Sequence, residues 1–344
     1  MIVCNGRCLD KPHTGIQRYT REILQRLPEV SLVRPPESLG VGLGFAWEQL
    51  LLPGLVKGNL LWNPANTGPM LGTVPQVVTV HDLATLNGVD SASRPARRWL
   101  YKWMLPTLLH KARGVLTVSE FSRQQIIEAC RLSADRIAAI PLGVDHTIFF
   151  PRPRDEVVSL RGRLALDEPY VLTVGSGSAR KNLRTLIEAW PIAVAEIGTD
   201  VELIITGDAA AYGRAFDGTR VPPLPPRSRL VGRLSDADLA VLMSGAAAFV
   251  FPSLFEGFGL PPLEAMAAGS PCIVSNTTSL PEVVGNAALL IDPTDKEAIA
   301  DAIASILNNR EIRDNLRTAG IVRAASFRWD ETARRTIEFL RSRC

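Results

Sequence analysis

Short runs of apolar residues alternate along this chain with longer segments in which apolar residues recur every three or four positions. The short runs, such as residues 77–80 and 246–251, have the length and composition of buried parallel strands. The longer segments, such as the one that places Ile16, Tyr19 and Ile23 on one face, are typical of helices that cover a sheet. This alternation predicts an α/β protein with doubly wound parallel sheets.

The alternation runs through both halves of the chain, and 344 residues are enough for two domains with separate cores. The pattern loses its periodicity around Phe150 and the prolines that follow it, and we place a linker at residues 151–168. We therefore predict an N-terminal domain at residues 1–150 and a second domain at residues 169–326, with a cleft between them.

The composition is that of a globular protein, with 46% apolar and 21% charged residues. No apolar run approaches the ~18 residues that a membrane span requires. The N-terminus reads as a first strand and not as a signal peptide, because no basic region precedes a long apolar one. The five cysteines are scattered, and no second pair or histidine cluster completes a zinc site, so we expect a reduced, cytoplasmic compartment.

The net charge of +3 is unevenly distributed, because residues 1–150 carry 16 Lys and Arg against 11 Asp and Glu. Within residues 94–113, basic side chains are interleaved with Trp99, Tyr101 and Trp103, and no acidic residue is present. Such a helix could rest on anionic lipid headgroups or bind a diphosphate-linked lipid, but a core-facing helix with a solvated basic face explains the pattern equally well. Pro106 argues against one straight helix, and a single basic helix is thin support for nucleic-acid binding.

The densest group of candidate functional residues is VFPSLFEGFGLPPLEAMAAGSPCIVSNTTSLPEVV, residues 250–284. A strand ends at its first proline, a glycine-containing loop follows, and residues 261–268 read as a helix with prolines in the first turn. Glu256 precedes this helix and Glu264 lies in its second turn. Both are therefore placed at the carboxyl end of the strand, where open α/β sheets bind ligands and where a carboxylate could accept the hydroxyls of a sugar.

Two groups of donors in the second domain suit a phosphate. The first is the unpaired backbone N–H groups of Phe258, Gly259 and Leu260 at the start of the helix. The second is the pair of cations Arg180 and Lys181, which also stand at a helix start. A Gly-x-Gly motif just before this pair invites a dinucleotide-binding interpretation, which fails because Arg180 occupies the position where Gly or Ala is expected.

The sequence E-G-F-G-L-P-P-L-E-A-M-A-A-G-x-P around the two glutamates resembles the signature of the retaining glycosyltransferases of family 4, which have the GT-B fold of two Rossmann-like domains. The resemblance covers nearly the whole chain and is strongest at residues 175–285 and weakest at residues 29–73. An ordinary strand-loop-helix unit with two solvated glutamates is the alternative. Packing alone, however, does not require so many matched glycines, prolines and acids together.

The resemblance implies that the second domain binds a nucleotide-sugar donor. Glu264 would bind the ribose hydroxyls and Glu256 the sugar, while Arg180, Lys181 and the N–H groups near Gly259 would bind the diphosphate. Of the basic pair, Lys181 matches the lysine of the family best, and with Glu256 it is a candidate catalytic residue. This sequence departs from the family pattern at one position, because the residue after Gly175 is a serine where many members have an arginine. The expected diphosphate contacts therefore depend on Arg180 and Lys181.

The nucleotide base would lie beside residues 231–234, which makes Val231 and Arg233 candidate donor-binding residues by the same resemblance. Close by, Asp236-Ala237-Asp238 superficially matches the Asp-x-Asp metal motif of the other large glycosyltransferase fold. Because these acids follow Ser235 in the first turn of a predicted helix, helix capping is the better account.

The resemblance also assigns roles in the first domain, residues 1–150, which would form the acceptor side. His81, in the motif His81-Asp82-Leu83 at the end of a strand, would contact the transferred sugar, although a lone histidine is often structural. Gly15, at a helix start, would approach the donor phosphates and the acceptor, unless it is needed only for a tight turn. The last helix, residues 327–344, would cross back to pack on the first domain.

Family 4 enzymes transfer a sugar by front-face displacement, with the leaving phosphate accepting the proton of the acceptor and with no metal or other cofactor required. The motifs resemble those of bacterial mannosyltransferases of exopolysaccharide and O-antigen assembly, so we favour GDP-mannose as donor and a lipid-linked or oligosaccharide acceptor. UDP-linked hexoses and dTDP-rhamnose remain open, as do a sugar-nucleotide 2-epimerase and a non-catalytic subunit of the same fold. The expected location is the cytoplasm, with peripheral association at the inner membrane through residues 94–113 as one possibility.

Overall fold

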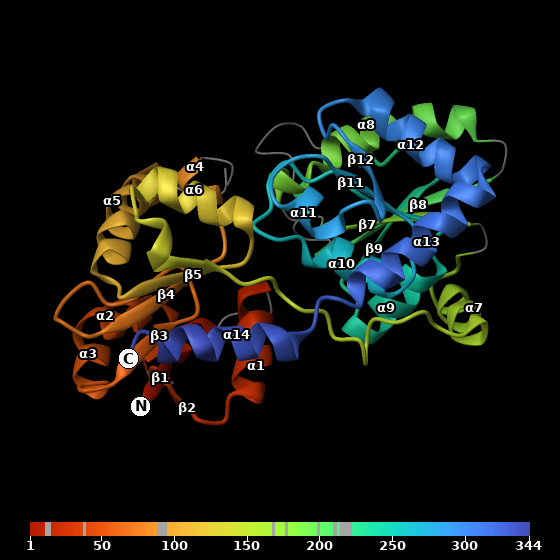
Figure 1. The fold of residues 1–344 in the computed structure, drawn as a ribbon. Coiled ribbons are helices and arrows are strands. Elements are labelled where there is room, and N and C mark those ends of the chain that lie inside the picture. The colour runs from red at the N-terminus through yellow and green to blue at the C-terminus, as the bar shows by residue number, and fades with distance from the viewer. Residues whose placement is uncertain are drawn as a thin grey trace. The chain divides into compact units, whose positions relative to one another are not determined.

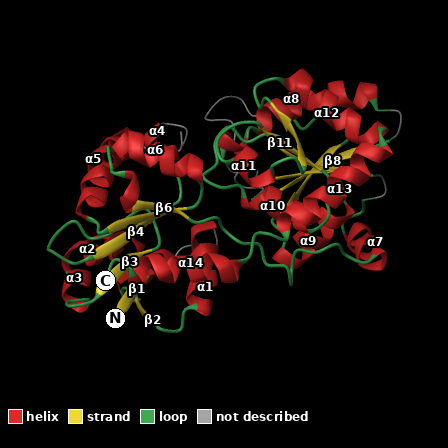
Figure 2. Ribbon diagram, viewed as in Figure 1, coloured by secondary structure: helices red, strands yellow, loops and turns green. Residues whose placement is uncertain are grey.

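The computed structural model describes residues 1–10, 15–36, 39–87, 95–166, 169–175, 178–197, 200–208, 212–213 and 222–344. These residues form two compact units, each built on a six-stranded parallel sheet (Figure 1, Figure 2). Unit 1 contains the described residues up to Gly143 together with residues 328–344, and unit 2 contains those of residues 144–327. The predicted fold class, two doubly wound α/β domains, is confirmed.

The sheet of unit 1 has the strand order β2-β1-β3-β4-β5-β6. Its strands are β1 (Ile2–Asn5), β2 (Val30–Val33), β3 (Leu60–Asn63), β4 (Gln76–Val80), β5 (Gly114–Thr117) and β6 (Ile137–Ala139). Its helices are α1 (Gly15–Arg26), α2 (Gly40–Leu50), α3 (Leu52–Leu55), α4 (Ala84–Asn87), α5 (Pro95–Lys111), α6 (Glu120–Cys130) and α14 (Trp329–Arg341), with 3-10 turns η1 (Gly6–Asp10) and η3 (Ala134–Arg136).

Strand alternation sorts the side chains of this sheet onto two faces. On one face, Leu61 packs among residues of α2 and α3, and Val78 packs among residues of α5 and α6. On the other face, the Trp62 indole N–H donates to the Thr79 hydroxyl at 3.0 Å, and the ring of Tyr19 from α1 packs edge-on against Trp62. Strands β1, β3, β4 and β5 are thus buried on both sides, which explains their short and mostly apolar runs.

The C-terminal helix α14 lies beside α1 within unit 1 (Figure 1). Arg26 Nε lies 2.8 Å from Asp330 Oδ1 across this contact. The preceding backbone passes very close to Gly143, where an added Cβ would lie 2.2 Å from the Trp329 nitrogen. Gly143 is therefore required by the close approach of two chain segments.

The sheet of unit 2 has the order β12-β11-β10-β7-β8-β9. Its strands are β7 (Tyr170–Val174), β8 (Glu202–Thr206), β9 (Ser228–Gly232), β10 (Ala248–Phe251), β11 (Cys272–Ser275) and β12 (Ala288–Ile291). Its helices are α7 (Arg154–Arg163), α8 (Leu183–Glu196), α9 (Asp236–Gly245), α10 (Leu260–Ala267), α11 (Leu280–Val284), α12 (Lys296–Asn308) and α13 (Arg310–Ala324), with a 3-10 turn η4 (Ala179–Lys181). Helices α8 and α12 pack together over a core that includes the fully buried Trp190, Val250 and Ile303.

Each sheet has one point at which the chain reverses its direction of travel across the strands. In unit 1 the chain goes from β1 to its neighbour β2 and then returns to β3 on the other side of β1. In unit 2 it goes from β7 through β8 to β9 and then returns to β10 on the other side of β7. Open parallel sheets bind ligands outside the carboxyl ends of the strands at such switch points. The topology thus marks two places, β1/β3 and β7/β10.

The segment predicted as a linker, residues 151–168, is corrected by the structure. It contains α7, which packs against α9 in unit 2 through Leu160 and Val241. The boundary between the units accordingly falls at Gly143 and not at residue 150. Helix α7 escaped detection because Leu160 is its one buried residue, so the sequence lacks the apolar stripe that marks a helix.

Candidate functional site

Three charged side chains meet at the carboxyl end of the sheet in unit 2. Lys181 Nζ lies 2.7 Å from Glu256 Oε1, and Arg180 Nη1 lies 3.1 Å from Glu256 Oε2. The Ser253 hydroxyl donates a further hydrogen bond to Glu256 Oε1 at 2.7 Å. Each carboxylate oxygen therefore faces a cation, and we call these four residues the Glu256 cluster.

The cluster lies at the β7/β10 switch point. Arg180 and Lys181 belong to η4, which follows β7, whereas Glu256 follows β10. The two strands pair in parallel, so their carboxyl ends are adjacent. Two hydrogen bonds then join the two loops: the Leu254 N–H donates to the carbonyl of Arg180 at 2.7 Å, and Arg180 Nη1 donates to the carbonyl of Phe255 at 2.9 Å. The predicted donor-binding cations and the predicted sugar-binding glutamate are thus in direct contact.

Gly175 makes room for the Lys181 side chain. Its φ is +114°, which side chains rarely adopt, and an added Cβ would lie 3.0 Å from Lys181 Cγ. The lysine stem therefore crosses the end of β7, and its Nζ lies 4.5 Å from the centre of the Phe251 ring. The ammonium group is held in place by the carboxylate and by the aromatic face together.

Glu256 is ionised in this setting. Burial alone would raise its pKa, but the charges of Lys181 and Arg180, with hydrogen bonds from Lys181 and Ser253, outweigh burial and lower the pKa to about 2. A carboxyl group with so low a pKa accepts hydrogen bonds and is a poor proton donor or base near neutral pH. Two cations against one carboxylate leave the cluster with a surplus positive charge, which suits an anionic ligand such as a diphosphate.

Helix α10 begins beside this cluster at Gly259, which has a φ of +113°. An added Cβ there would lie 2.6 Å from Leu280 Cδ2, so both the backbone conformation and the available space require glycine. Phe258 before it is buried, and Leu260 is half-buried. Glu264 is buried in the second turn of α10, as predicted from its spacing.

Sequence reasoning missed the residues that fix the Glu256 loop. The Ser279 hydroxyl lies 2.9 Å from the backbone carbonyls of both Glu256 and Phe258, and the Thr278 hydroxyl accepts the Glu256 N–H at 3.3 Å. Ser253 was missed as well, although it lies three residues before Glu256. Small hydroxyl residues that flank a candidate carboxylate were the available signal.

Two predicted base-binding residues lie at an edge of the sheet in unit 2. Val231 belongs to the edge strand β9 and is half-buried, and Arg233 follows this strand and is exposed. The end of β9 is held by Thr206, whose hydroxyl donates to the carbonyl of Gly232 at 2.8 Å. Ser176, which stands where many members of the family have an arginine, lies outside the described residues.

The remaining predicted site residues belong to unit 1. His81 follows β4 and is buried, and its Nε2 lies 2.8 Å from the carbonyl of Pro64, so Nε2 carries the proton and Nδ1 is the acceptor. Burial lowers the pKa of His81, while the Pro64 carbonyl and the Asp82 charge oppose that shift. His81 is therefore suited to hydrogen bonding as a neutral ring. Gly15 is the first residue of α1, at a helix start as predicted, and it is exposed.

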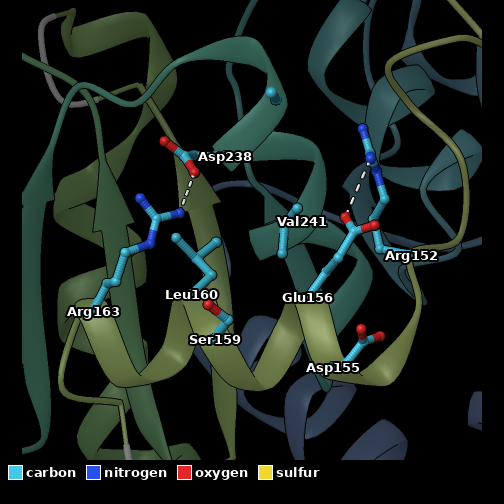
Figure 3. Close-up of a pocket in the computed structure, with 9 residues that line it drawn as sticks. Arg152, Asp155, Glu156, Ser159, Leu160, Arg163, Asp238 and Val241 are labelled. Atoms are coloured by element: carbon cyan, nitrogen blue, oxygen red, sulfur yellow. Dashed lines mark hydrogen bonds and ion pairs between the residues drawn. The ribbon is translucent and has the colours of Figure 1, made fainter.

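A groove of about 440 Å³ separates α7 from α9 in unit 2 (Figure 3). Its floor is formed by Leu160 and its ends by two ion pairs, Arg163 with Asp238 at 2.5 Å and Arg152 with Glu156 at 3.3 Å. Four of its charged side chains form these two pairs, and the groove shares no residue with the Glu256 cluster. Asp238 also donates its backbone N–H to the Ser235 hydroxyl, which confirms the helix-capping interpretation.

The predicted basic helix is α5, which runs from Pro95 to Lys111 with Pro106 inside it. Pro106 does not divide this helix, and the carbonyl left without its usual N–H donor is that of the exposed Lys102. One face of α5 packs into unit 1, while Trp99 and Trp103 on the other are each 65% exposed. Among the described helices, none combines the length and the apolar character needed to cross a membrane.

Comparison with known proteins reveals two family models along the chain. Residues 57–148 match the model described as Glycosyltransferase Family 4, and residues 160–323 match the model described as Glycosyl transferases group 1. The first match covers mainly unit 1 and ends five residues past its boundary at Gly143, and the second lies within unit 2.

The chain is 35% identical over 267 residues to O-antigen chain mannosyltransferase B of Escherichia coli, covering 76% of this chain and 68% of that protein. It is 30% identical over 349 residues to MMP alpha-(1->4)-mannosyltransferase of Mycolicibacterium hassiacum, covering 95% and 74%. Among solved structures, Anabaena HepE in complex with UDP-glucose has a TM-score of 0.78 at 18% identity and covers 99% of both chains, a likeness of fold.

Proposed function

The chain belongs to the glycosyltransferases of family 4, which have the GT-B fold, and on this premise we propose that it transfers mannose from GDP-mannose to a lipid-linked or saccharide acceptor. The transfer would retain the configuration at the anomeric carbon and require no metal ion. The observation that carries the proposal is the Glu256 cluster, in which two cations and an ionised carboxylate meet at the β7/β10 switch point.

The charges of the cluster fit the two ends of a nucleotide-diphosphate sugar. Lys181 and Arg180 would bind the diphosphate, where they stabilise the negative charge that develops as the bond from the sugar to phosphate breaks. Glu256, with its low pKa, would accept hydrogen bonds from sugar hydroxyls. The N–H groups at the start of α10 would add to the binding of phosphate, and Glu264 would bind the ribose.

The proposed reaction needs no protein nucleophile. The acceptor oxygen bonds to the anomeric carbon on the face from which the phosphate departs, and its proton passes to the leaving phosphate oxygen. This agrees with an ionised Glu256 that is held by two cations, because a carboxylate with so low a pKa is a weak base near neutral pH. His81 would contribute a hydrogen bond to the sugar as a neutral ring.

The choice of mannose rests on the relatives, two of which are named mannosyltransferases. UDP-linked sugars are the alternative, because the HepE structure contains UDP-glucose on the same fold. A non-catalytic subunit is disfavoured by the intact cluster, since binding a protein partner requires neither cation to face Glu256.

The exposed face of α5 supports a lipid-linked acceptor. The Trp99 and Trp103 rings lie 6.3 Å apart on a helix without acidic residues, and Lys102 is exposed beside them. Tryptophans with basic neighbours are typical of surfaces that bind anionic lipid headgroups. We therefore place the enzyme at the cytoplasmic face of the membrane.

Acceptor-dependent consumption of the donor tests this function. The protein is incubated with GDP-mannose and methyl α-D-mannopyranoside, with and without EDTA, and the product is analysed by NMR. The proposal expects GDP release that requires the acceptor and persists in EDTA, with an α-linked product. Conversion of GDP-mannose without an acceptor would indicate epimerase or hydrolase chemistry instead.

A further inference from the structure

The second switch point, between β1 and β3 in unit 1, holds a polar cluster that the function above does not use. It consists of Asn5 at the end of β1, Asn63 at the end of β3, Glu48 of α2, Arg7 of η1 and Thr67. We call it the Glu48 cluster. Its position in unit 1 corresponds to that of the Glu256 cluster in unit 2, because each lies at the carboxyl ends of the two strands that flank the reversal.

The contacts of the Glu48 cluster converge on one carboxylate oxygen. Asn5 Nδ2 donates to Glu48 Oε1 at 2.7 Å, the Thr67 hydroxyl donates to the same oxygen at 3.1 Å, and Arg7 Nε lies 3.1 Å from it. Asn5 Nδ2 also lies 2.9 Å from Asn63 Oδ1, which links the ends of β1 and β3. Arg7 Nη2 donates to the Thr67 hydroxyl at 2.7 Å, so the guanidinium is held at two points.

This arrangement is costly if it serves stability alone. Glu48 and Asn63 are fully buried, and Glu48 Oε2 has no hydrogen-bond partner within the described part of the chain. A buried ion pair with an unsatisfied oxygen contributes little to the free energy of folding. Apolar side chains of the same volume would stabilise the fold as much or more. Asn5 and Asn63 occupy strand positions whose neighbours Val3 and Leu61 face the core, so polar groups here break the apolar pattern.

The backbone at Gly68 confines the cluster on one side. An added Cβ there would lie 2.8 Å from Asn63 Nδ2, whereas one at Gly44 of α2 would make an ordinary contact with Arg7 Cδ at 3.5 Å. Arg7 keeps 17% of its side-chain surface exposed, whereas the Glu48 side chain has none. Within the described residues Arg7 Nη1 has no hydrogen-bond partner. Glu48 is therefore placed to orient Arg7, and Arg7 to meet a ligand.

The charge balance distinguishes this ligand from a diphosphate. The Glu256 cluster has two cations for one carboxylate, but the Glu48 cluster has one cation for one carboxylate, and its other members are neutral amides and a hydroxyl. A neutral group of fixed donors and acceptors suits the hydroxyls of a sugar better than it suits an anion.

We propose that Arg7 binds hydroxyl groups of a neutral saccharide acceptor and that Glu48 is the residue that positions it. The inference rests on the proposed transferase function, because it assigns the acceptor sugar to the switch point of unit 1. Arg7 is then an acceptor-specificity residue that has no role in binding the donor.

Saturation-transfer NMR without any donor tests the ligand class directly. The probes are methyl α-D-mannopyranoside, which is neutral, and mannose 1-phosphate, which is anionic. The wild type binds the neutral sugar, and Arg7→Met weakens that binding by about 10- to 100-fold, as expected for the loss of hydrogen bonds from a charged donor. The matched control Arg334→Met, at an exposed arginine of α14 in unit 1, leaves it unchanged. Unaltered binding in Arg7→Met, or wild-type binding of mannose 1-phosphate alone, overturns the proposal.

Kinetics test the positioning role of Glu48. In Glu48→Gln the KM for the mannoside rises several-fold while the KM for GDP-mannose stays unchanged, and adding Glu48→Gln to Arg7→Met has no further effect because the two residues act as one unit. Arg7→Lys restores part of the acceptor binding. If Arg7→Met does not fold, as judged by circular dichroism, the same comparison is made with Arg7→Lys, Glu48→Gln and their double variant. Effects on the acceptor KM that add in the double variant would contradict the positioning role of Glu48. A wild type that binds the mannoside but not GDP-mannose refutes the donor proposal alone.

Discussion

Lys181 Nζ and Glu256 Oε1 lie 2.7 Å apart although 75 positions separate the two residues in the sequence. Lys181 follows β7 and Glu256 follows β10, so the contact is created by the pairing of these two strands. The ion pair joins a residue proposed to bind the diphosphate to one proposed to bind the sugar. A nucleotide-sugar that binds in this way would place its diphosphate at Lys181 and its sugar at Glu256, on the two sides of the bond that breaks.

Lys181→Met should lower kcat/KM for GDP-mannose by ~100-fold or more, because it removes a cation that stabilises the departing phosphate. The methionine keeps a stem of similar length that packs against Gly175, so the fold should be preserved. Lys296→Met, at a lysine that starts α12 and has 45% of its side-chain surface exposed, is the matched control and should be unaffected. Steady-state GDP release measures the effect, and turnover equal to the wild type would contradict the role of Lys181.

The stability of unit 2 should depend on pH through Glu256. Its pKa falls from 4.5 to about 2 on folding, so the native state binds the proton less readily than the unfolded state does. The ionised group therefore stabilises the fold fully above about pH 5, and ~3 kcal/mol of the free energy of unfolding is lost as the pH falls from there to about 2. In Glu256→Gln this contribution is absent, and the variant should approach the wild type in stability as the pH falls. Urea unfolding between pH 7 and pH 3 measures the difference, and parallel pH profiles would show that Glu256 is not held as described.

Gly259→Ala should destabilise the protein by ~1–3 kcal/mol and weaken donor binding. The substitution forces a side chain into a φ of +113° and brings its Cβ within 2.6 Å of Leu280, which displaces the start of α10. Gly162→Ala is the control, because an added Cβ there meets nothing within 4 Å in the helix α7, and alanine should stabilise it by up to about 1 kcal/mol. Thermal melting of both variants gives the comparison, and equal effects of the two would refute the steric argument.

Replacing Trp99 and Trp103 by serine should reduce binding to vesicles that contain phosphatidylglycerol by about 10-fold, since two exposed aromatic anchors are lost. Binding of the wild type should weaken as salt is added, because the basic neighbours of these residues contribute electrostatically. Val322→Ser, at a residue of α13 that is 70% exposed, serves as the control in unit 2. Vesicle sedimentation reports the result. Vesicle binding that is unaffected by the two tryptophan substitutions and by added salt would exclude α5 as the membrane-binding surface.

The parts of the fold that the sequence predicted are those with strong periodicity. The strands predicted at residues 77–80 and 246–251 and the helix predicted at residues 261–268 match β4, β10 and α10 to within two residues at each end. Helix α7 was missed because its apolar residues form no continuous stripe, and Leu160 is its one buried residue. Helix α2 was missed because its glycine-rich sequence is apolar on several sides, and Leu43 and Phe45 are exposed on it.

The site was predictable as a set of residues but not as a geometry. Arg180, Lys181 and Glu256 were each identified from local motifs, yet their mutual contact depends on the paths of two loops and could not be read from spacing. The Glu48 cluster was not predicted at all. Its signal is an asparagine at the end of each of two apolar strands, which becomes meaningful only once the strand order places β1 beside β3.

Calorimetric titration of the wild type and Lys181→Met with GDP-mannose, UDP-glucose and a dTDP-sugar, without added metal, tests the central claim most directly. The account predicts that the wild type binds GDP-mannose in preference to the other donors and that Lys181→Met loses this binding by ~10-fold or more, because a charge-assisted hydrogen bond to phosphate is removed. Binding of UDP-glucose alone would overturn the proposal of mannose transfer but would leave the Glu256 cluster as the donor site. No binding of any nucleotide-sugar, or equal affinity in both proteins, would contradict the assignment of the Glu256 cluster as the donor site.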